Sequence, residues 1–316
     1  LDLLEITEDF APRTKYILAR SQKEVYESQG KVGSKYWVEQ YKVAASKMLD
    51  SMSERTLQTC IIPPNVTHIN GVISVAFNNT SRIAEYAGLT HSICLDFFLK
   101  SLGVSNLYES RIGSFPLGIN SKFLPDLLVR TLRLNCLTKY YACLWEDLYQ
   151  DEFIYKEWSI SDPRQSPFSM IGRNWDFLSS PLKNAFERRI ALVEIDVIVS
   201  MALGIPLNDL LNMYLIQFSV MQKFENDTWY DQNGKIVFTI NSQGLKGVGI
   251  DRKEWNQIKG MKAGETYDHT ITKSELYYGK KVTYYAPFDK CDRVEDYKRA
   301  WAHFEKVFAE KEGEKA

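Results

Sequence analysis

A long helix is predicted by residues 182–204, whose sequence is LKNAFERRIALVEIDVIVSMALG. It begins near Leu182 and is closed by Gly204, a residue that commonly ends helices. A second predicted helix opens at Pro206 and continues to about Lys223. Because the turn between them is so short, the two helices are expected to pack as an antiparallel pair.

Other segments also have helical patterns. Residues 93–102 are apolar enough for a buried helix, which Gly103 ends. Leucines and aromatic residues recur at helical spacing through residues 124–149, and residues 294–311 carry a core-facing aromatic stripe. Residues 36–52 have a period close to 3.6 with lysines between the apolar positions, which predicts a short helix or a helix–strand pair beneath a basic face.

Strands are predicted between these helices. Residues 56–62 and 71–77 are β-prone runs, expected to pair across the loop from Pro63 to Asn70. Residues 104–120 have the composition of a loop with a short strand. Near the C-terminus, Asn233-Gly234 predicts one hairpin, and a second is expected to turn near Gly279. The fold class predicted is α+β.

Two modules are expected along the chain. Residues 158–181 are rich in Ser, Pro, Asp and Gly and form the best internal boundary. We therefore expect a mixed α/β domain over residues 1–155 and a helical module with small β-hairpins over residues 156–316. The first ten residues are acidic and begin with Leu1, which suggests a connector within a longer chain.

Composition limits the class of protein. The sequence has no apolar run of about 18 residues and no signal peptide, so a cytoplasmic protein with no membrane contact is expected. The five cysteines are scattered among apolar neighbours and are expected to be reduced core thiols. Neither they nor the four histidines have metal-ligand spacing, so no metal site is predicted.

The charges are unevenly distributed. Residues 11–145 hold 16 Lys and Arg against 9 Asp and Glu, although the whole chain has a net charge of −1. A basic half favours phosphate attraction there, whereas an overall charge near zero argues against strong nucleic-acid binding. An uneven scatter of surface charge with no function is the simpler alternative.

Three blocks of the sequence match one protein family, in the order that the family shows, over most of residues 50–305. They are Glu54-Arg55-Thr56-Leu57 with Ile61-Ile62-Pro63-Pro64, then Arg133-Leu134-Asn135-Cys136-Leu137-Thr138 with Leu144-Trp145-Glu146, then Ala191-Leu192-Val193-Glu194-Ile195-Asp196, Asp227-Thr228-Trp229-Tyr230-Asp231 and Ala286-Pro287-Phe288-Asp289. On these blocks the chain resembles the TaqI-like target-recognition region that lies C-terminal to the catalytic domain in large S-adenosylmethionine-dependent adenine DNA methyltransferases.

The resemblance implies DNA reading without DNA modification. Enzymes of this family hold the flipped adenine with an Asn-Pro-Pro-aromatic loop and bind the cofactor at a glycine-rich turn. Neither motif occurs here, since Pro63-Pro64 follows Ile62 and precedes Asn65. The implied partners are double-stranded DNA and an upstream methyltransferase domain of the same chain, in a restriction-modification or related phage-defence system. S-adenosylmethionine would be bound in the parent enzyme, and no cofactor is expected on residues 1–316.

Candidate DNA-binding residues fall into three groups. Arg55 and Thr56 would contact a phosphate or a guanine edge, or Arg55 would instead pair with a carboxylate such as Glu54 or Asp50. Polar residues of two loops would read base edges, or would be ordinary turn residues. Scattered cations would hold the DNA backbone, or would simply be solvated. The loop residues are Asn65, Thr67, His68, Asn70, Asn106 and Arg111, and the cations are Lys35, Lys42, Lys47 and Arg82.

No catalytic residue is predicted. A restriction-type nuclease needs an acidic residue followed by Glu-x-Lys, and the set from Glu157 to Lys183 lacks that spacing. Two alternatives to DNA recognition remain, namely a protein-interaction scaffold within a defence complex and a divergent Mg²⁺-dependent nuclease. Salt-dependent DNA binding would distinguish DNA recognition from the scaffold, and a cleavage assay with Mg²⁺ would detect the nuclease.

Overall fold

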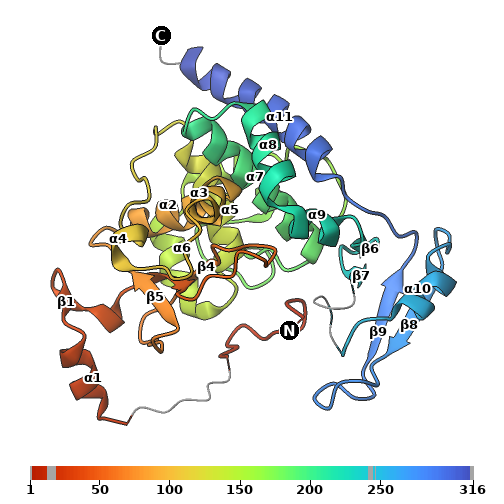
Figure 1. Cartoon of the computed structure of the whole chain (residues 1–316), viewed down its shortest axis with the longest axis horizontal. Coiled ribbons are helices and arrows are strands. Elements are labelled where there is room, and N and C mark those ends of the chain that lie inside the picture. The colour runs from red at the N-terminus through yellow and green to blue at the C-terminus, as the bar shows by residue number, and fades with distance from the viewer. Residues whose placement is uncertain (1, 13–18, 241–244, 246, 314–316) are drawn as a thin grey trace.

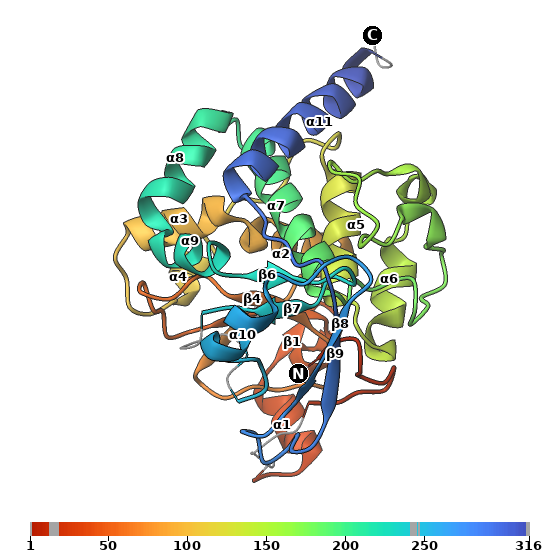
Figure 2. The same cartoon turned by 90° about the vertical axis from the view of Figure 1, so that its right-hand side faces the viewer.

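The computed structural model describes residues 2–12, 19–240, 245 and 247–313. Most helices form a central body, and the small antiparallel sheets lie toward the end opposite the C-terminal end of the last helix (Figures 1 and 2). The α-helices are α1 (Gln22–Ser28), α2 (Thr80–His91), α3 (Ile93–Ser101), α4 (Glu109–Ile112), α5 (Leu124–Asn135), α6 (Ala142–Leu148), α7 (Ala185–Ala202), α8 (Leu207–Gln217), α9 (Ser219–Glu225), α10 (Arg252–Ile258) and α11 (Arg293–Gly313). The strands are β1 (Lys31–Val32), β2 (Lys35–Tyr36), β3 (Lys42–Ser46), β4 (Thr59–Ile62), β5 (Val72–Val75), β6 (Trp229–Tyr230), β7 (Ile236–Phe238), β8 (Thr266–Thr270) and β9 (Lys281–Tyr285), and the 3-10 helices are η1 (Trp37–Glu39), η2 (Lys139–Tyr141), η3 (Asp151–Tyr155) and η4 (Phe168–Met170). The predicted α+β class is confirmed.

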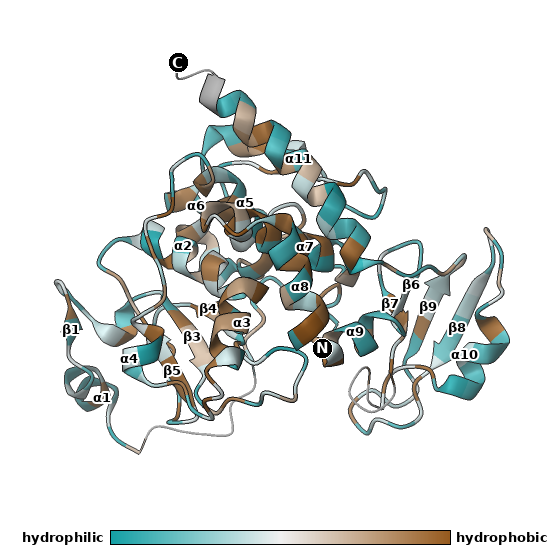
Figure 3. Cartoon of the chain, turned by 45° about the horizontal axis from the view of Figure 1, so that its top comes forward, coloured by the Kyte–Doolittle hydropathy of each residue, from teal (hydrophilic) through white to brown (hydrophobic). Residues whose placement is uncertain are grey.

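Helix α7 is the centre of the helical body. Asn184 and Glu187 form a reciprocal capping box at its start, and Gly204 follows its end with φ of +70°. The helix contacts α2, α5 and α11, and its residues from Ile190 to Ser200 are almost all buried. Hydrophobic residues are accordingly concentrated in the central helices (Figure 3). The predicted helices at residues 93–102, 182–203 and 294–311 are confirmed.

Two other predicted helices are interrupted. Residues 124–149 form α5 and α6 with a break at Cys136, where ψ is +60°. The helix expected from Pro206 to Lys223 divides at Phe218, where ψ is +42°, into α8 and α9. Cys136 and Phe218 are both buried, so each break turns the chain around a side chain that belongs to the core. Apolar spacing alone does not reveal such a turn.

Strand β3 lies in the middle of a three-stranded sheet. The predicted strands at residues 56–62 and 71–77 are present as β4 and β5, but the expectation that they pair with each other is wrong, because each pairs with β3. Of the two alternatives predicted for residues 36–52, the helix–strand pair is present, as the 3-10 turn η1 followed by β3, and a longer helix is not. Val43, Ala44 and Ala45 are all buried, so β3 lacks the alternation of polar and apolar residues that identifies a half-buried strand. Residues 104–120 form α4 and a single bridge to Met48 in place of the predicted short strand.

Both predicted C-terminal hairpins are confirmed. The β6–β7 turn contains Gly234 with φ of +78°, and Asp231 accepts hydrogen bonds from two backbone N–H groups in the same turn. The β8–β9 turn contains Gly279 with φ of +79°. Helix α10 contributes Trp255, whose ring stacks on Phe238 of β7 with 5.4 Å between ring centroids. These elements share a small hydrophobic core of their own.

Residues 158–181 pack against the helical body and do not separate two cores. Arg133 of α5 is buried and donates a hydrogen bond to the carbonyl group of Ser180. Phe168 belongs to one hydrophobic cluster that contains residues from both sides of residue 155. The predicted division at that residue therefore does not correspond to a break in the core. The carbonyl groups of this irregular, serine-rich segment supply hydrogen-bond acceptors for a buried arginine.

This packing predicts the order of proteolysis. Trypsin is expected to cut after Lys273, an exposed residue of the β8–β9 loop, before it cuts after Arg164. The Arg164 side chain is 7% exposed and forms ion pairs with Asp162 and Asp289. Mass spectrometry of the earliest fragments tests this order. Equally early cleavage after Arg164 would support the two-module division instead.

The five cysteines are free thiols. Cys94 and Cys136 are buried, as predicted, and Cys291 is half-buried. Cys60 and Cys143 are exposed, so the prediction of core thiols is wrong for these two. Their sequence neighbours are apolar, but both side chains point out of the packed elements that carry them.

A buried network of charges joins α7, α9 and α11. Arg293 donates to Asp196 at 3.1 Å and to Glu225 at 2.7 Å, and Arg189 also pairs with Glu225 at 2.9 Å. Asp196 in addition accepts a hydrogen bond from the backbone N–H of Ile93 at the start of α3. Burial by itself would raise the pKa of Glu225, but Arg293 and Arg189 lower it to about 2.

The lowered pKa predicts how stability depends on pH. Glu225 titrates near 4.5 in the unfolded chain and near 2 in the folded one, so its ionisation stabilises the fold above pH 4.5 and this contribution is lost as the pH falls toward 2. The variant Glu225→Gln is therefore expected to be less stable than the parent protein at pH 7 by about 3 kcal/mol. The difference should shrink markedly at pH 3. Urea unfolding at both pH values tests this, and a difference that does not change with pH would contradict it.

Candidate nucleic-acid interface

Several predicted DNA-binding residues meet at one end of the three-stranded sheet. Lys47 follows β3, and its backbone N–H donates to Gly71 while its carbonyl group accepts from Leu107. The next residue, Met48, bridges to Asn106. The loop after β4 and the segment before α4 are therefore held on either side of Lys47. We call this the sheet-end surface, and it comprises Lys47, Asn70 and Asn106 together with Thr67 and His68 of the loop that leads to Asn70. Asn65, at the start of that loop, lies at the opposite end of the sheet, where Lys42 pairs with Ile62.

Side-chain contacts hold part of this surface in place. The ammonium group of Lys47 donates to Oδ1 of Asn70 at 3.0 Å and lies 5.8 Å from the centroid of the Tyr108 ring. His68 contacts the hydroxyl group of Ser74 through Nε2 at 2.7 Å and the carbonyl group of Ile69 through Nδ1 at 3.2 Å.

The other end of the loop is fixed at Asn65. This residue follows Pro63-Pro64 and has φ of +65°, a conformation that asparagine tolerates better than most residues. Its N–H donates to the carbonyl group of Val38 at 2.7 Å, and its Oδ1 accepts from the hydroxyl group of Tyr26 at 2.8 Å. The loop is therefore anchored at its start, while residues 65–70 are exposed to solvent.

Apolar side chains lie among these polar groups. Val66, Ile69, Tyr108 and Met48 are exposed by 38%, 49%, 53% and 72%. Such a mixture suits a DNA groove, where polar groups bond to base edges and apolar groups contact thymine methyls. Tyr26, Ser74 and Tyr108 contact the predicted residues although the sequence did not single them out. Exposure identifies Tyr108, and exposure cannot be read from one sequence.

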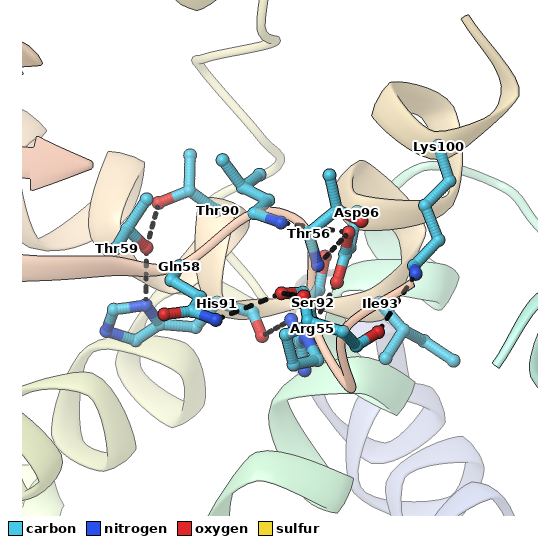
Figure 4. Close-up of polar contacts among 12 residues, drawn as sticks. Arg55, Thr56, Gln58, Thr59, Thr90, His91, Ser92, Ile93, Asp96 and Lys100 are labelled. Carbon is cyan, nitrogen blue, oxygen red and sulfur yellow. Dashed lines mark hydrogen bonds and ion pairs between the residues drawn. The ribbon is translucent and has the colours of Figure 1, made fainter. Parts of the chain in front are cut away.

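Arg55 and Thr56 belong to a different environment. Arg55 donates from Nε to Asp96 at 2.9 Å, and the backbone N–H groups of Thr56 and Leu57 also donate to this carboxylate. A further guanidinium N–H of Arg55 donates to the carbonyl group of His91 at 2.6 Å. Figure 4 shows Arg55 and Thr56 gathered around Asp96 beside the start of α3. Of the two interpretations of Arg55, the structure therefore shows a carboxylate pair, although the partner is Asp96 and not Glu54 or Asp50.

Lys42 does not lie on a basic face, and this expectation is wrong. The residue is 1% exposed, and its ammonium group donates to the carbonyl groups of Val38 and Gln40. Burial lowers the pKa of Lys42 to about 8. Its position on β3, the central strand, places the side chain within the protein, where it cannot reach a phosphate.

The remaining predicted residues lie apart from the sheet-end surface. Arg82 on α2 pairs with Glu85 at 2.6 Å. Arg111 on α4 and Lys35 on β2 are exposed. Their exposure is compatible with phosphate contact, but no described contact joins them to Lys47 or to residues 65–70.

The basic balance of residues 11–145 is carried outside the core. Arg13 and Lys15 lie outside the described residues, which leaves 14 cations and 9 acids in this range. Three of each are buried, so an excess of five cations remains among the described residues that are not buried. The buried cations are Lys42, Arg130 and Arg133, and the buried acids are Glu85, Asp96 and Asp126.

No protein-family model, curated protein or solved structure matches this chain. Within residues 2–12, 19–240, 245 and 247–313, no group of three or more His, Cys, Asp and Glu side chains is placed to hold a metal ion. In the same part of the chain, none of the helices combines the length and the apolar character that a membrane span requires. The arrangement of the sheet-end surface is thus the observation on which a function can be built.

Proposed function

We propose that this chain is the DNA sequence-recognition region of an adenine-specific DNA methyltransferase of a restriction-modification or related phage-defence system. The methyl transfer, which needs S-adenosylmethionine, takes place on an upstream domain of the parent enzyme in the cytoplasm. The observation that carries the proposal is the convergence of Lys47, His68, Asn70 and Asn106 on one surface, although the sequence separates them by up to 59 residues. The resemblance of three sequence blocks to the recognition regions of such enzymes supports it.

The chemistry of the surface fits a double helix. Asparagine can bond to both edge groups of adenine, a lysine can contact guanine or a phosphate, and histidine adds a donor and an acceptor. The loop that carries most of these groups is anchored at Asn65 and Asn70, so binding would order few additional residues. The surrounding excess of cations would attract the phosphate backbone irrespective of sequence.

The proposal predicts weak, salt-dependent binding of duplex DNA by this chain. Affinity is expected to fall with added salt by an amount that corresponds to on the order of three to six released counterions. The variant Lys47→Met should weaken binding several-fold and reduce the salt slope by about one counterion. Fluorescence anisotropy at several salt concentrations measures both quantities.

The matched control is Lys306→Met on the exposed side of α11, far along the chain from the sheet-end surface. It removes the same charge and should leave the salt slope unchanged. Equal effects of the two variants would show that only net charge matters. If the unaltered chain, residues 1–316, does not bind duplex DNA even at low salt, the proposal is rejected in favour of the interaction scaffold.

A further inference from the structure

The N-terminal segment lies across a large cavity. The cavity has a volume of about 910 Å³, and its walls come from the start of α7, the end of α9 and the hairpins β6–β7 and β8–β9. Residues 2–7 and Phe10 form one further wall. The segment therefore covers a space between the helical body and the C-terminal hairpins.

The charges of the cavity and of the segment are complementary. Apart from the segment, the lining contains six cations, namely Lys183, Arg188, Arg189, Lys235, Lys280 and Arg293, and two acids, Glu54 and Glu225. The segment contributes Asp2 and Glu5 to the lining and no cation. Glu5 forms an ion pair with Lys280, and Asp2 lies 3.9 Å from the ammonium group of Lys235. Two acids of the segment thus face a wall with an excess of positive charge.

Four of the six cations are available to an anion. Arg189 and Arg293 are already neutralised within the buried network. Arg188 donates from one nitrogen to the carbonyl groups of Leu134 and Leu182 and forms no ion pair with any carboxylate that the structure describes. Lys183 lies over the ring of Phe177 and likewise forms no ion pair among the described residues.

The segment is held by contacts that a polyanion can replace. Ile6 is buried, and the carbonyl group of Glu8 accepts from the backbone N–H of Lys139. The pairs of Asp2 and Glu5 are partly exposed, and such pairs contribute little to stability and weaken with salt. DNA phosphates carry a higher density of negative charge than two carboxylates.

Lys235 and Lys280 belong to the two C-terminal hairpins. Figures 1 and 3 draw β5 and the β8–β9 hairpin on opposite sides of the helical body. The cavity therefore offers a contact region in addition to the sheet-end surface.

We infer that residues 2–10 act as an acidic strap over a second phosphate-binding surface, formed by Lys183, Arg188, Lys235 and Lys280, from which DNA displaces them. This inference rests on the proposed function and adds a second contact region with built-in competition. In the unbound chain the strap neutralises Lys235 and Lys280. In the bound chain the phosphate backbone takes its place.

The test compares two variants with the same net charge. The double variant Asp2→Asn/Glu5→Gln removes the strap's two cavity-lining acids. The control Asp209→Asn/Glu305→Gln removes two exposed acids of α8 and α11. At low salt the strap variant is expected to bind a short duplex about threefold to tenfold more tightly than the control. Equal affinities of the two variants would overturn the inference.

A second readout follows the strap itself. A Glu-specific protease should cleave after Glu5 faster when duplex DNA is bound to the parent protein, because the strap has left the cavity. Another outcome is DNA binding without a change in the rate of cleavage after Glu5, together with equal affinities of the strap variant and its control. In that case the inference about the strap is rejected and the proposed DNA recognition stands. If neither the parent protein nor the variants bind duplex DNA, both proposals fail together.

Discussion

Replacing Arg293 with Met is expected to lower the free energy of unfolding by about 3–5 kcal/mol. Arg293 is buried and bonds to Asp196 and Glu225, so its removal leaves two carboxylates inside the protein with less compensation. Asp196 is fully buried, and burial, the largest influence on its pKa, raises that pKa even with the cations in place. Urea unfolding followed by circular dichroism at neutral pH measures the loss.

Arg299→Met on the same helix is the matched control. The Arg299 side chain is 57% exposed and lies 3.7 Å from Glu295, which is also exposed. Its loss should change the free energy of unfolding by no more than about 0.5 kcal/mol. If the two variants lost equal stability, the buried network would not be what joins α7, α9 and α11.

Replacing Asp96 with Ala is expected to cost a similar amount, about 3–5 kcal/mol. Asp96 is fully buried and accepts hydrogen bonds from Arg55 and from the backbone N–H groups of Thr56 and Leu57. The variant leaves a guanidinium and two N–H groups without their acceptor. Asp50→Ala serves as the control, because Asp50 is exposed, and it should stay within about 0.5 kcal/mol of the parent protein.

The variant Arg55→Met distinguishes a structural role of Arg55 from a role in DNA binding. If Arg55 only orders the start of β4 against α3, this variant will melt at a lower temperature and keep its DNA affinity per folded molecule. An unchanged melting temperature together with a lower affinity for DNA would instead indicate that Arg55 contacts DNA. The geometry around Asp96 favours the first result.

Local signals in the sequence predicted most helices and both C-terminal hairpins. Gly204, Gly234 and Gly279 adopt the positive φ values that end a helix or close a hairpin, and such residues act within a few positions of themselves. The aromatic stripe of α11 likewise needs only its own periodicity. These features do not depend on distant parts of the chain.

Features that depend on distant residues were not predicted. The pairing of β4 and β5 with β3 requires a partner that looks helical by its apolar spacing, and the burial of Lys42 follows from that pairing. The boundary predicted at residues 158–181 is an irregular segment whose carbonyl groups accept hydrogen bonds from Arg133 of α5. The composition of residues 158–181 indicates an irregular segment, but it does not reveal that Arg133 is its partner.

The residues of the candidate site likewise include some that local sequence could identify and others that depend on distant contacts. Polar residues grouped in one loop, such as Asn65 and His68, could be selected from the sequence because turns and recognition loops share that composition. Lys47 joins them through its hydrogen bond to Asn70, and Asn106 through its bridge to Met48, and neither contact can be read from the sequence. Arg55 could not be placed, since its partner Asp96 lies 41 residues further along the chain.

Selection from a pool of random duplexes measures sequence-selective DNA binding by this chain directly. The parent protein at low salt is expected to enrich one short motif over repeated rounds. The variants His68→Ala and Asn70→Ala should each relax selection at one or two positions of that motif, with a salt slope like that of the parent protein. Recovery of a pool without any common motif, or no recovery of DNA at all, would show that this chain does not recognise a DNA sequence.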